Sequence, residues 1–150
     1  MQNYFQVRIR VTKVVKAKSK RVFEVYLVKA YSFTEAEANI TKALMDRENY
    51  NSMTISSIDR FQVDSVYNFD FENKYWICKV DMNSVGDTKP IKLRYLVNSK
   101  DANTAAEEMR NILNTNSNSS NHEIVSIQSS QILEIFEEVQ SENAQSDDLH

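Results

Sequence analysis

The segment "YLVKAYSFTEAEANITKAL" at residues 26–44 decides the fold, because the chain repeats it without a gap as "YLVNSKDANTAAEEMRNIL" at residues 95–113. Similar pairs of segments lie on both sides of it, and an internal repeat of this kind outweighs single elements as evidence for architecture. The flanking pairs are "YFQVRIRV" (4–11) with "YWICKVDM" (75–82), and "TISSIDRFQV" (54–63) with "EIVSIQSSQI" (123–132). We therefore interpret the chain as a tandem duplication.

Each copy is expected to form a strand, a second strand, a helix and a third strand. From Phe5 to Val11 apolar and polar residues alternate, which is the period of a strand with one buried face. A turn at "AKSK" (17–20) leads to the second strand, "RVFEVYLVKAY" (21–31). Short polar side chains favour helix N-caps, so the helices begin at Ser32 or Thr34 and at Asp101 or Asn103. One long strand closes each copy, over residues 52–69 and 123–136.

This pattern predicts an α+β fold in which two tandem ββαβ units form an antiparallel sheet with the helices packed on one face. The units cover about residues 4–70 and 74–136, and together they make a single domain over residues 1–136. The stretch from 137 to 150 is acidic and has no periodicity, so we expect a disordered tail.

The composition argues against most enzyme classes. The chain has 150 residues, with one cysteine, one glycine, one proline and two histidines. Neither histidine lies in a pattern typical of a metal site or a nucleophile relay, and glycine-rich phosphate loops are excluded. No apolar run is long enough to span a membrane. We expect a non-enzymatic protein without a cofactor or metal, in the cytoplasm of a bacterial host cell, with no membrane contact.

Positive charge is concentrated at the amino end. Residues 1–30 carry eight basic side chains and one carboxylate, that of Glu24, although the whole chain has a net charge of -3. Cations that follow a hairpin match the electrostatic footprint of a protein that binds phosphate backbones. The candidate contacts are Arg8, Arg10, Lys13, Lys16, Lys18, Lys20 and Arg21, and, in the second copy, Lys79, Lys92 and Arg94.

Aromatic residues accompany these cations, as base stacking by a single-strand binder requires. Aromatic residues on strands also commonly belong to the core, and this alternative stays open. The stacking candidates are Phe23, Tyr31, Tyr67 and Tyr75.

Two further features concern partners. Residues 22–28 are apolar on both faces of the expected strand, which predicts either a central strand or a homodimer or higher oligomer. The acidic tail is either a solubilising end, or a segment that occupies the cationic surface or contacts a protein partner.

The segments "YLVKAYSFTEAEANI" (26–40), "ISSID" (55–59) and "KYWICKV" (74–80) resemble an uncharacterised domain family of gut Bacteroidetes and their crAss-like phages. The resemblance extends from about Tyr4 to Phe136, and "SFTEAEA" (32–38) is its most specific element. It implies no established activity, but a phage context suits a role in replication or nucleic-acid handling. The layout is also loosely similar to Whirly-type single-strand binders.

We therefore expect a protein that binds single-stranded nucleic acid, DNA in preference to RNA, through a basic β-hairpin and aromatic residues. The alternative is a protein–protein interaction or virion-associated module without affinity for nucleic acid.

Overall fold

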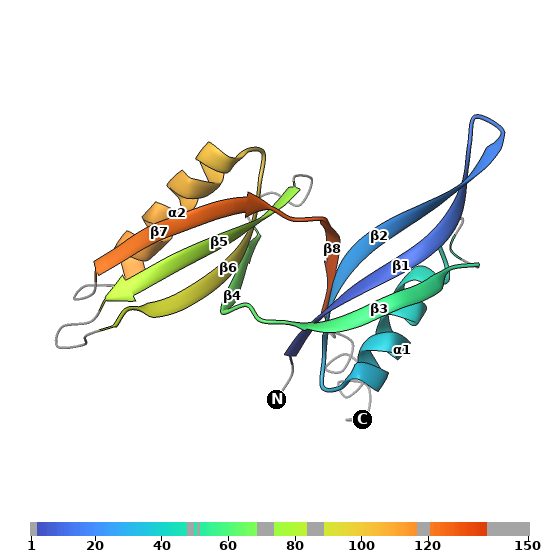
Figure 1. Ribbon diagram of the computed structural model, residues 1–150, viewed down its shortest axis with the longest axis horizontal. Coiled ribbons are helices and arrows are strands. Elements are labelled where there is room, and N and C mark those ends of the chain that lie inside the picture. Colours follow the sequence, from blue (N-terminus) through green and yellow to red (C-terminus); the bar gives the residue numbers. More distant parts are fainter. Residues whose placement is uncertain are drawn as a thin grey trace, which may run out of the picture. The chain divides into compact units, whose positions relative to one another are not determined.

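The structure is a computed structural model that describes residues 3–47, 50, 52–68, 74–83, 89–116 and 121–137. Within them the fold is α+β, with two helices and eight strands in two four-stranded sheets (Figure 1). The first sheet has the order β3-β1-β2-β8, and the second has the order β4-β6-β5-β7. The elements are β1 (Asn3–Val15), β2 (Lys18–Ala30), α1 (Phe33–Leu44), β3 (Thr54–Phe61), β4 (Ser65–Asn68), β5 (Lys74–Asn83), β6 (Ile91–Ser99), α2 (Ala102–Asn116), β7 (Asn121–Ser129) and β8 (Ile132–Phe136).

The expectation of one antiparallel sheet was wrong. In each sheet three strands are antiparallel, but the fourth is parallel to its neighbour: β8 to β2, and β4 to β6. Because a parallel neighbour has to arrive from a remote part of the chain, it cannot be recognised from the alternation of a hairpin. Each sheet is therefore mixed.

The long strand expected at the end of each copy is in fact two strands. After β3 ends at Phe61, Asp64 is held by β6: its backbone N–H donates to the Arg94 carbonyl oxygen (2.7 Å), and its carboxylate accepts from the Arg94 backbone N–H (2.8 Å). After β7 ends, the N–H and hydroxyl of Ser130 both donate to the Tyr75 carbonyl oxygen, at 3.0 and 2.9 Å. These contacts break each long strand, and the two pieces lie in different sheets.

As a result, each sheet is completed by a strand from the other half of the chain. Strand β4 follows β3 in sequence but pairs with β6, and β8 follows β7 but pairs with β2. The chain divides into two compact units accordingly. Unit 1 contains the residues up to Phe61 and those from Ile132 onward, and unit 2 contains residues 62–131. These boundaries differ from the two expected repeats because the last strand of each expected repeat pairs in the sheet of the other.

The two sheets share their strand order and several details. Read from the opposite end, the second sheet has the order β7-β5-β6-β4, in which each strand occupies the place of its counterpart in β3-β1-β2-β8. A β-bulge interrupts the β1–β3 pairing between Arg8 and Ile9, and another interrupts the β5–β7 pairing between Lys79 and Val80. Tyr26 packs against Phe136 with ring centroids 5.5 Å apart, and Tyr95 packs against Tyr67 at 5.8 Å.

Each unit has one hydrophobic core between its helix and its sheet (Figure 1). In α1 the buried residues Ala36, Ile40 and Leu44 recur every four positions, so they form one apolar stripe. Fully burying a large aliphatic side chain contributes about 1.5–3 kcal/mol, so a stripe of this kind outweighs the helix propensity of its residues. The stripe meets Phe5, Val7, Ile9, Val11, Tyr26 and Val28 in unit 1, and in unit 2 Ala105, Met109 and Leu113 meet Cys78, Val80, Tyr95 and Val97.

The helix starts resolve the alternatives that the sequence leaves open. The Ser32 hydroxyl accepts a hydrogen bond from the backbone N–H of Glu35 at 3.1 Å, and the Glu35 carboxylate accepts from the N–H of Tyr31 at 2.8 Å. In α2 the carboxylate of Asp101 accepts from the N–H of Thr104 at 2.7 Å. Ser32 and Asp101 are therefore the caps, and both satisfy N–H groups that a helix leaves unpaired.

We predict that neither half of the chain folds as a monomer when the chain is cut within residues 69–73. Each half lacks the fourth strand of its own sheet, so the N–H and C=O groups along β2 or β6 lose their partners. Mixing the halves restores a cooperative urea transition, which light scattering should assign to a complex of both. A single half that is monomeric and unfolds cooperatively would contradict the prediction.

Candidate nucleic-acid interface

The sheet face of unit 1 that points away from α1, here called the open face, carries the first two candidate cations. In β1 the buried residues Phe5, Val7 and Ile9 alternate with Arg8 and Arg10, which are exposed, so the predicted alternation is confirmed. Arg10 lies opposite Phe23 on β2. The Arg8 guanidinium lies 4.4 Å from the centre of the Phe23 ring, and that ring is 51% exposed. A cation and an aromatic face therefore lie together on this surface.

Beyond the open face, β1 and β2 continue as a two-stranded arm from Thr12 to Arg21 (Figure 1). The pairing with β3 stops at Arg10, and the pairing with β8 starts at Val25, so neither strand covers this part of the hairpin. We call it the β-arm. It carries Lys16, Lys18, Lys20 and Arg21, all of them exposed.

The turn of the β-arm lies one residue earlier than the expected "AKSK" turn. Lys16 and Ala17 form it, with φ angles of 54° and 67°. A two-residue hairpin loop with positive φ at both positions matches the right-handed twist of its strands, but it ordinarily uses asparagine and glycine. Lys16 is thus held at the tip of the β-arm in a left-handed conformation that costs about 1–2 kcal/mol.

The cations of the hairpin are divided between two faces. Because Thr12 pairs with Arg21, and side chains alternate along each strand, Arg21 continues the open face of Arg8 and Arg10. Lys20 pairs with Lys13, which shares the face of Val11, so these lysines lie on the face that α1 covers further down the sheet. Residues 16–21 of the β-arm are exposed on both faces. Among the described residues, no ion pair involves Arg8, Arg10, Lys16, Lys18, Lys20 or Arg21.

Lys13 is the exception among the candidate cations, because a carboxylate neutralises it. Its ammonium lies 2.6 Å from the Glu24 carboxylate, whose side chain is 10% exposed. The hydroxyls of Tyr26 and Tyr50 also donate to Glu24, at 2.8 and 2.6 Å. Lys13 is therefore part of a polar network beside the core and does not join the phosphate-binding candidates.

The pKa shifts in this network follow from these contacts. Burial acts to raise the pKa of Glu24, but the hydrogen bonds from Lys13, Tyr50 and Tyr26 outweigh it and lower that pKa below 4.5. The hydrogen bond to Glu24 raises the pKa of Lys13. Burial, together with hydrogen bonds to Tyr50 and Glu24, raises the pKa of Tyr26. Glu24 and Lys13 are consequently both charged at neutral pH.

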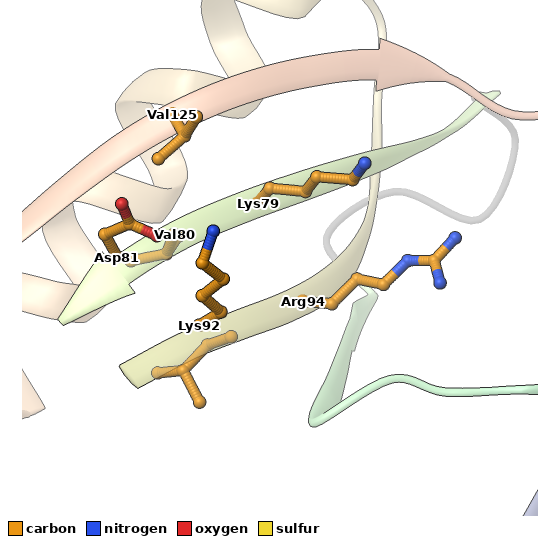
Figure 2. A pocket seen from close by; sticks show the side chains of 7 residues that line it. Lys79, Val80, Asp81, Lys92, Arg94 and Val125 are labelled. Carbon is orange, nitrogen blue, oxygen red and sulfur yellow. The ribbon is translucent and has the colours of Figure 1, made fainter. Parts of the chain in front are cut away.

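In unit 2, Lys79, Lys92 and Arg94 lie on the face of the sheet that points away from α2, and the Arg94 guanidinium points away from Lys92 (Figure 2). Lys79 of β5 lies directly opposite Arg94 of β6, and Lys92 lies opposite Asp81. They line a hollow of about 340 Å³, and Figure 2 shows Val125 of β7 beside them. The sequence identified the three cations but not Asp81 or Val125. Val125 is the extra residue of the β-bulge, and no sequence signal marks that position.

The stacking candidates divide into exposed and packed residues. Phe23 and Tyr31 are 51% and 61% exposed, so both are accessible to a base. Tyr75 is buried, and Tyr67 packs against Tyr95, so these two serve the fold of unit 2. Phe69 and Phe71, which lie near Tyr67 in the sequence, are outside the described residues.

Other sequence predictions concern the apolar strand and the tail. Residues Val25–Val28 are buried within the single chain, so this strand no longer argues for a homodimer, which stays a prediction.

Glu137, expected in the tail, contacts unit 1: its carboxylate accepts from the Tyr4 hydroxyl at 3.0 Å and lies 4.0 Å from the Lys29 ammonium. The remainder of the expected tail, residues 138–150, is outside the described residues.

Metal-type side-chain clusters and the single cysteine are the remaining features of chemical interest. No three side chains of histidine, cysteine, aspartate or glutamate come together there as a metal site requires. Cys78 is completely buried, and this burial raises the pKa of its thiol to about 11, so the reactive thiolate is disfavoured at neutral pH. Neither α1 nor α2 is long and apolar enough to cross a membrane.

The Glu24 network predicts an acid-sensitive contribution to stability. Because folding lowers the pKa of Glu24, its contribution is complete above the ordinary value of 4.5 and is lost as the pH falls through the folded pKa. Glu24→Gln should therefore lower the free energy of unfolding at pH 7 and flatten its decrease below about pH 4.5, as measured by urea denaturation. Glu37→Gln, on the exposed side of α1, is the control. An unchanged acid limb in Glu24→Gln would count against the network.

The comparisons with known proteins identify a family. The sequence matches the family described as Domain of unknown function (DUF4494) over residues 3–138. No curated protein matches the chain.

Proposed function

The chain belongs to this DUF4494 family, and we propose that it is a non-enzymatic protein that binds single-stranded nucleic acid through the β-arm and the open face of unit 1. The observation that carries the proposal is a set of exposed cations without an ion pair to any described residue, arranged along one hairpin. They are Arg8, Arg10, Lys16, Lys18, Lys20 and Arg21.

The geometry of this hairpin suits an extended polyanion. From Arg8 to Lys16 the strand covers about 26 Å at 3.3 Å per residue. Neutralising several phosphates along such a length releases their counterions, which supplies most of the sequence-independent affinity for nucleic acid. Because the β-arm is only two strands thick, Lys18 and Lys20 on one face and Arg21 on the other are all within reach of the same backbone.

The aromatic residues favour a single strand over a duplex. Phe23 follows Arg21 by two residues on β2, so its side chain lies on the same face as Arg21, Arg8 and Arg10. A half-exposed ring beside cations offers a stacking surface to an unpaired base, whereas the bases of a duplex are stacked on one another. Tyr31, which is 61% exposed, is the second candidate. We favour DNA as the ligand.

The biological setting and the origin of the fold are part of the proposal. The family resemblance suggests replication or DNA handling in a phage or in its bacterial host. The shared strand order, the matching β-bulges and the matching aromatic pairs support a tandem duplication in which the copies exchange their last strands. In each unit the helix follows two strands, so the Whirly layout of four strands before a helix adds no support.

A protein-interaction role is the second candidate, and one observation favours it. Val14 and Val15 of the β-arm are 62% and 51% exposed. Apolar side chains at the end of a projecting hairpin suit a contact with another protein, as do the unpaired edges of its strands. This alternative predicts a stable complex in a pulldown and no affinity for oligonucleotides.

The test is a titration of a labelled single-stranded oligonucleotide, followed by fluorescence anisotropy, at about 50 mM and about 200 mM salt. The combined variant Arg8→Gln, Arg10→Gln and Arg21→Gln should weaken binding to all sequences alike. It should also reduce the slope of log affinity against log salt by about 2, because each phosphate contact contributes about 0.7 for single strands.

A matched control removes the same charge from exposed positions elsewhere, through Lys42→Gln, Lys74→Gln and Lys100→Gln. The control should keep most of the affinity and the salt slope. If the original chain does not bind at the lower salt, the proposal fails. If both variants lose the same affinity, binding depends on the net charge of the chain and not on the hairpin.

The stacking contribution is tested by Phe23→Ala. Loss of one stacked base costs about 1–3 kcal/mol, so affinity should fall by roughly fivefold or more while the salt slope stays the same. Phe23→Trp, which keeps an aromatic face, should retain the affinity. Unchanged binding in Phe23→Ala would remove base stacking at this residue from the proposal.

A further inference from the structure

The sheet of unit 2 has a hollow on the face that points away from α2, and basic side chains from two neighbouring strands line it. Among the described residues, its lining contributes three cations, Lys79, Lys92 and Arg94, and one carboxylate, Asp81. Lys79 and Arg94 lie directly opposite each other on neighbouring strands. Phosphate oxygens accept charge-assisted hydrogen bonds from both kinds of cation.

Asp81 forms no ion pair with Lys79 or Lys92. Asp81 lies opposite Lys92 in the β5–β6 pairing. This pair is the next one after Lys79 and Arg94 on the same face of the sheet. No ion pair with a described residue involves Lys79 or Lys92. These two lysines consequently keep their positive charge beside the hollow.

The corresponding place in unit 1 shows that this charge is not a shared property of the fold. Arg8 and Lys79 both precede the bulge in their sheets, and each has one partner on the next strand. The partner of Arg8 is Val25, whereas the partner of Lys79 is Arg94. The cation pair across two strands is therefore particular to unit 2.

We propose that this hollow binds the phosphate group of a nucleotide. A volume of about 340 Å³ lies at the lower end of the range of small-molecule sites, and it exceeds what a lone phosphate fills. Val125, which the bulge leaves 55% exposed beside the cations, offers an apolar contact for the attached sugar or base (Figure 2). The phosphate belongs either to a free nucleotide or to a nucleic-acid end. This site does not depend on the proposed function of the β-arm.

The experiment is an NMR titration of the full chain with deoxyadenosine monophosphate, with deoxyadenosine as the uncharged probe, at constant ionic strength. Saturable amide shifts centred on residues 79–81, 92–94 and 125 are expected with the monophosphate alone. Lys79→Gln with Lys92→Gln should weaken binding by roughly fivefold for each lysine. Asp81→Asn should strengthen binding several-fold because it removes the one carboxylate that the described residues place in the lining.

The controls separate this site from general charge effects and from the β-arm. Lys74→Gln with Lys100→Gln removes the same charge from exposed positions in unit 2 and should leave the affinity unchanged. The combined Arg8, Arg10 and Arg21 variant should also bind the monophosphate normally, whatever happens to its oligonucleotide affinity. Shifts that do not saturate, equal losses in the Lys74 and Lys100 control, or no gain in Asp81→Asn would each overturn the proposal.

The source of the phosphate is distinguished with two oligonucleotides of one sequence, which end in a 5′-phosphate or a 5′-hydroxyl. If the hollow takes a nucleic-acid end, only the phosphorylated oligonucleotide shifts the amides of residues 79–81 and 92–94. If it takes a free nucleotide, neither oligonucleotide does so, and the monophosphate alone binds. Equal shifts from both oligonucleotides would show contact with internal phosphates and would overturn the assignment to a nucleotide or a terminal phosphate.

Discussion

The parallel pairing of β8 with β2, and of β4 with β6, is the constraint on which both sheets depend. The backbone of β2 around Val25–Val28 is buried, and buried N–H and C=O groups need partners. Neither half of the chain supplies that partner from its own hairpin, so each sheet takes its fourth strand from the other half. Arg47 strengthens the arrangement in unit 1, where it donates two hydrogen bonds to Glu134 of β8, at 2.9 and 3.0 Å.

The points at which β3 and β8 stop pairing with the β1–β2 hairpin determine which basic side chains are exposed. Strands β3 and β8 stop at Arg10 and Val25, so no further described strand pairs with the rest of the β1–β2 hairpin. Towards its tip, Lys16, Lys18, Lys20 and Arg21 are all exposed. Further down, Lys13 shares the side of the sheet that packs on the core, where a cation needs a counter-charge, and Glu24 provides it. Glu24 thus neutralises Lys13, whereas Lys18 and Lys20 on the same face, and Arg8, Arg10 and Arg21 on the other, form no ion pair with a described residue.

Much of the fold could be read from local patterns. Alternation placed Phe5, Val7 and Ile9 in the core and Arg8 and Arg10 outside, since a strand turns successive side chains to opposite faces. The same rule places Lys13 and Arg10 on opposite faces of β1. The sequence prediction nevertheless grouped them, because basic residues are frequent throughout this segment. Alternation does not identify the neighbour of a strand, so only the structure showed that β4 and β8 pair with strands of the other half. It also showed that Tyr67 and Tyr75 are packed and are not available for stacking.

The sequence by itself determined the α+β class, the order of elements, two candidate starts for each helix, and the concentration of basic residues at the amino end. Only the tertiary structure decided which strands are adjacent, which cations are neutralised, and that Lys79, Lys92 and Arg94 share one hollow. The reason is physical: periodicity and capping act over a few residues of chain, whereas a pairing partner, a counter-charge or a bulge residue such as Val125 comes from a segment far away in the sequence.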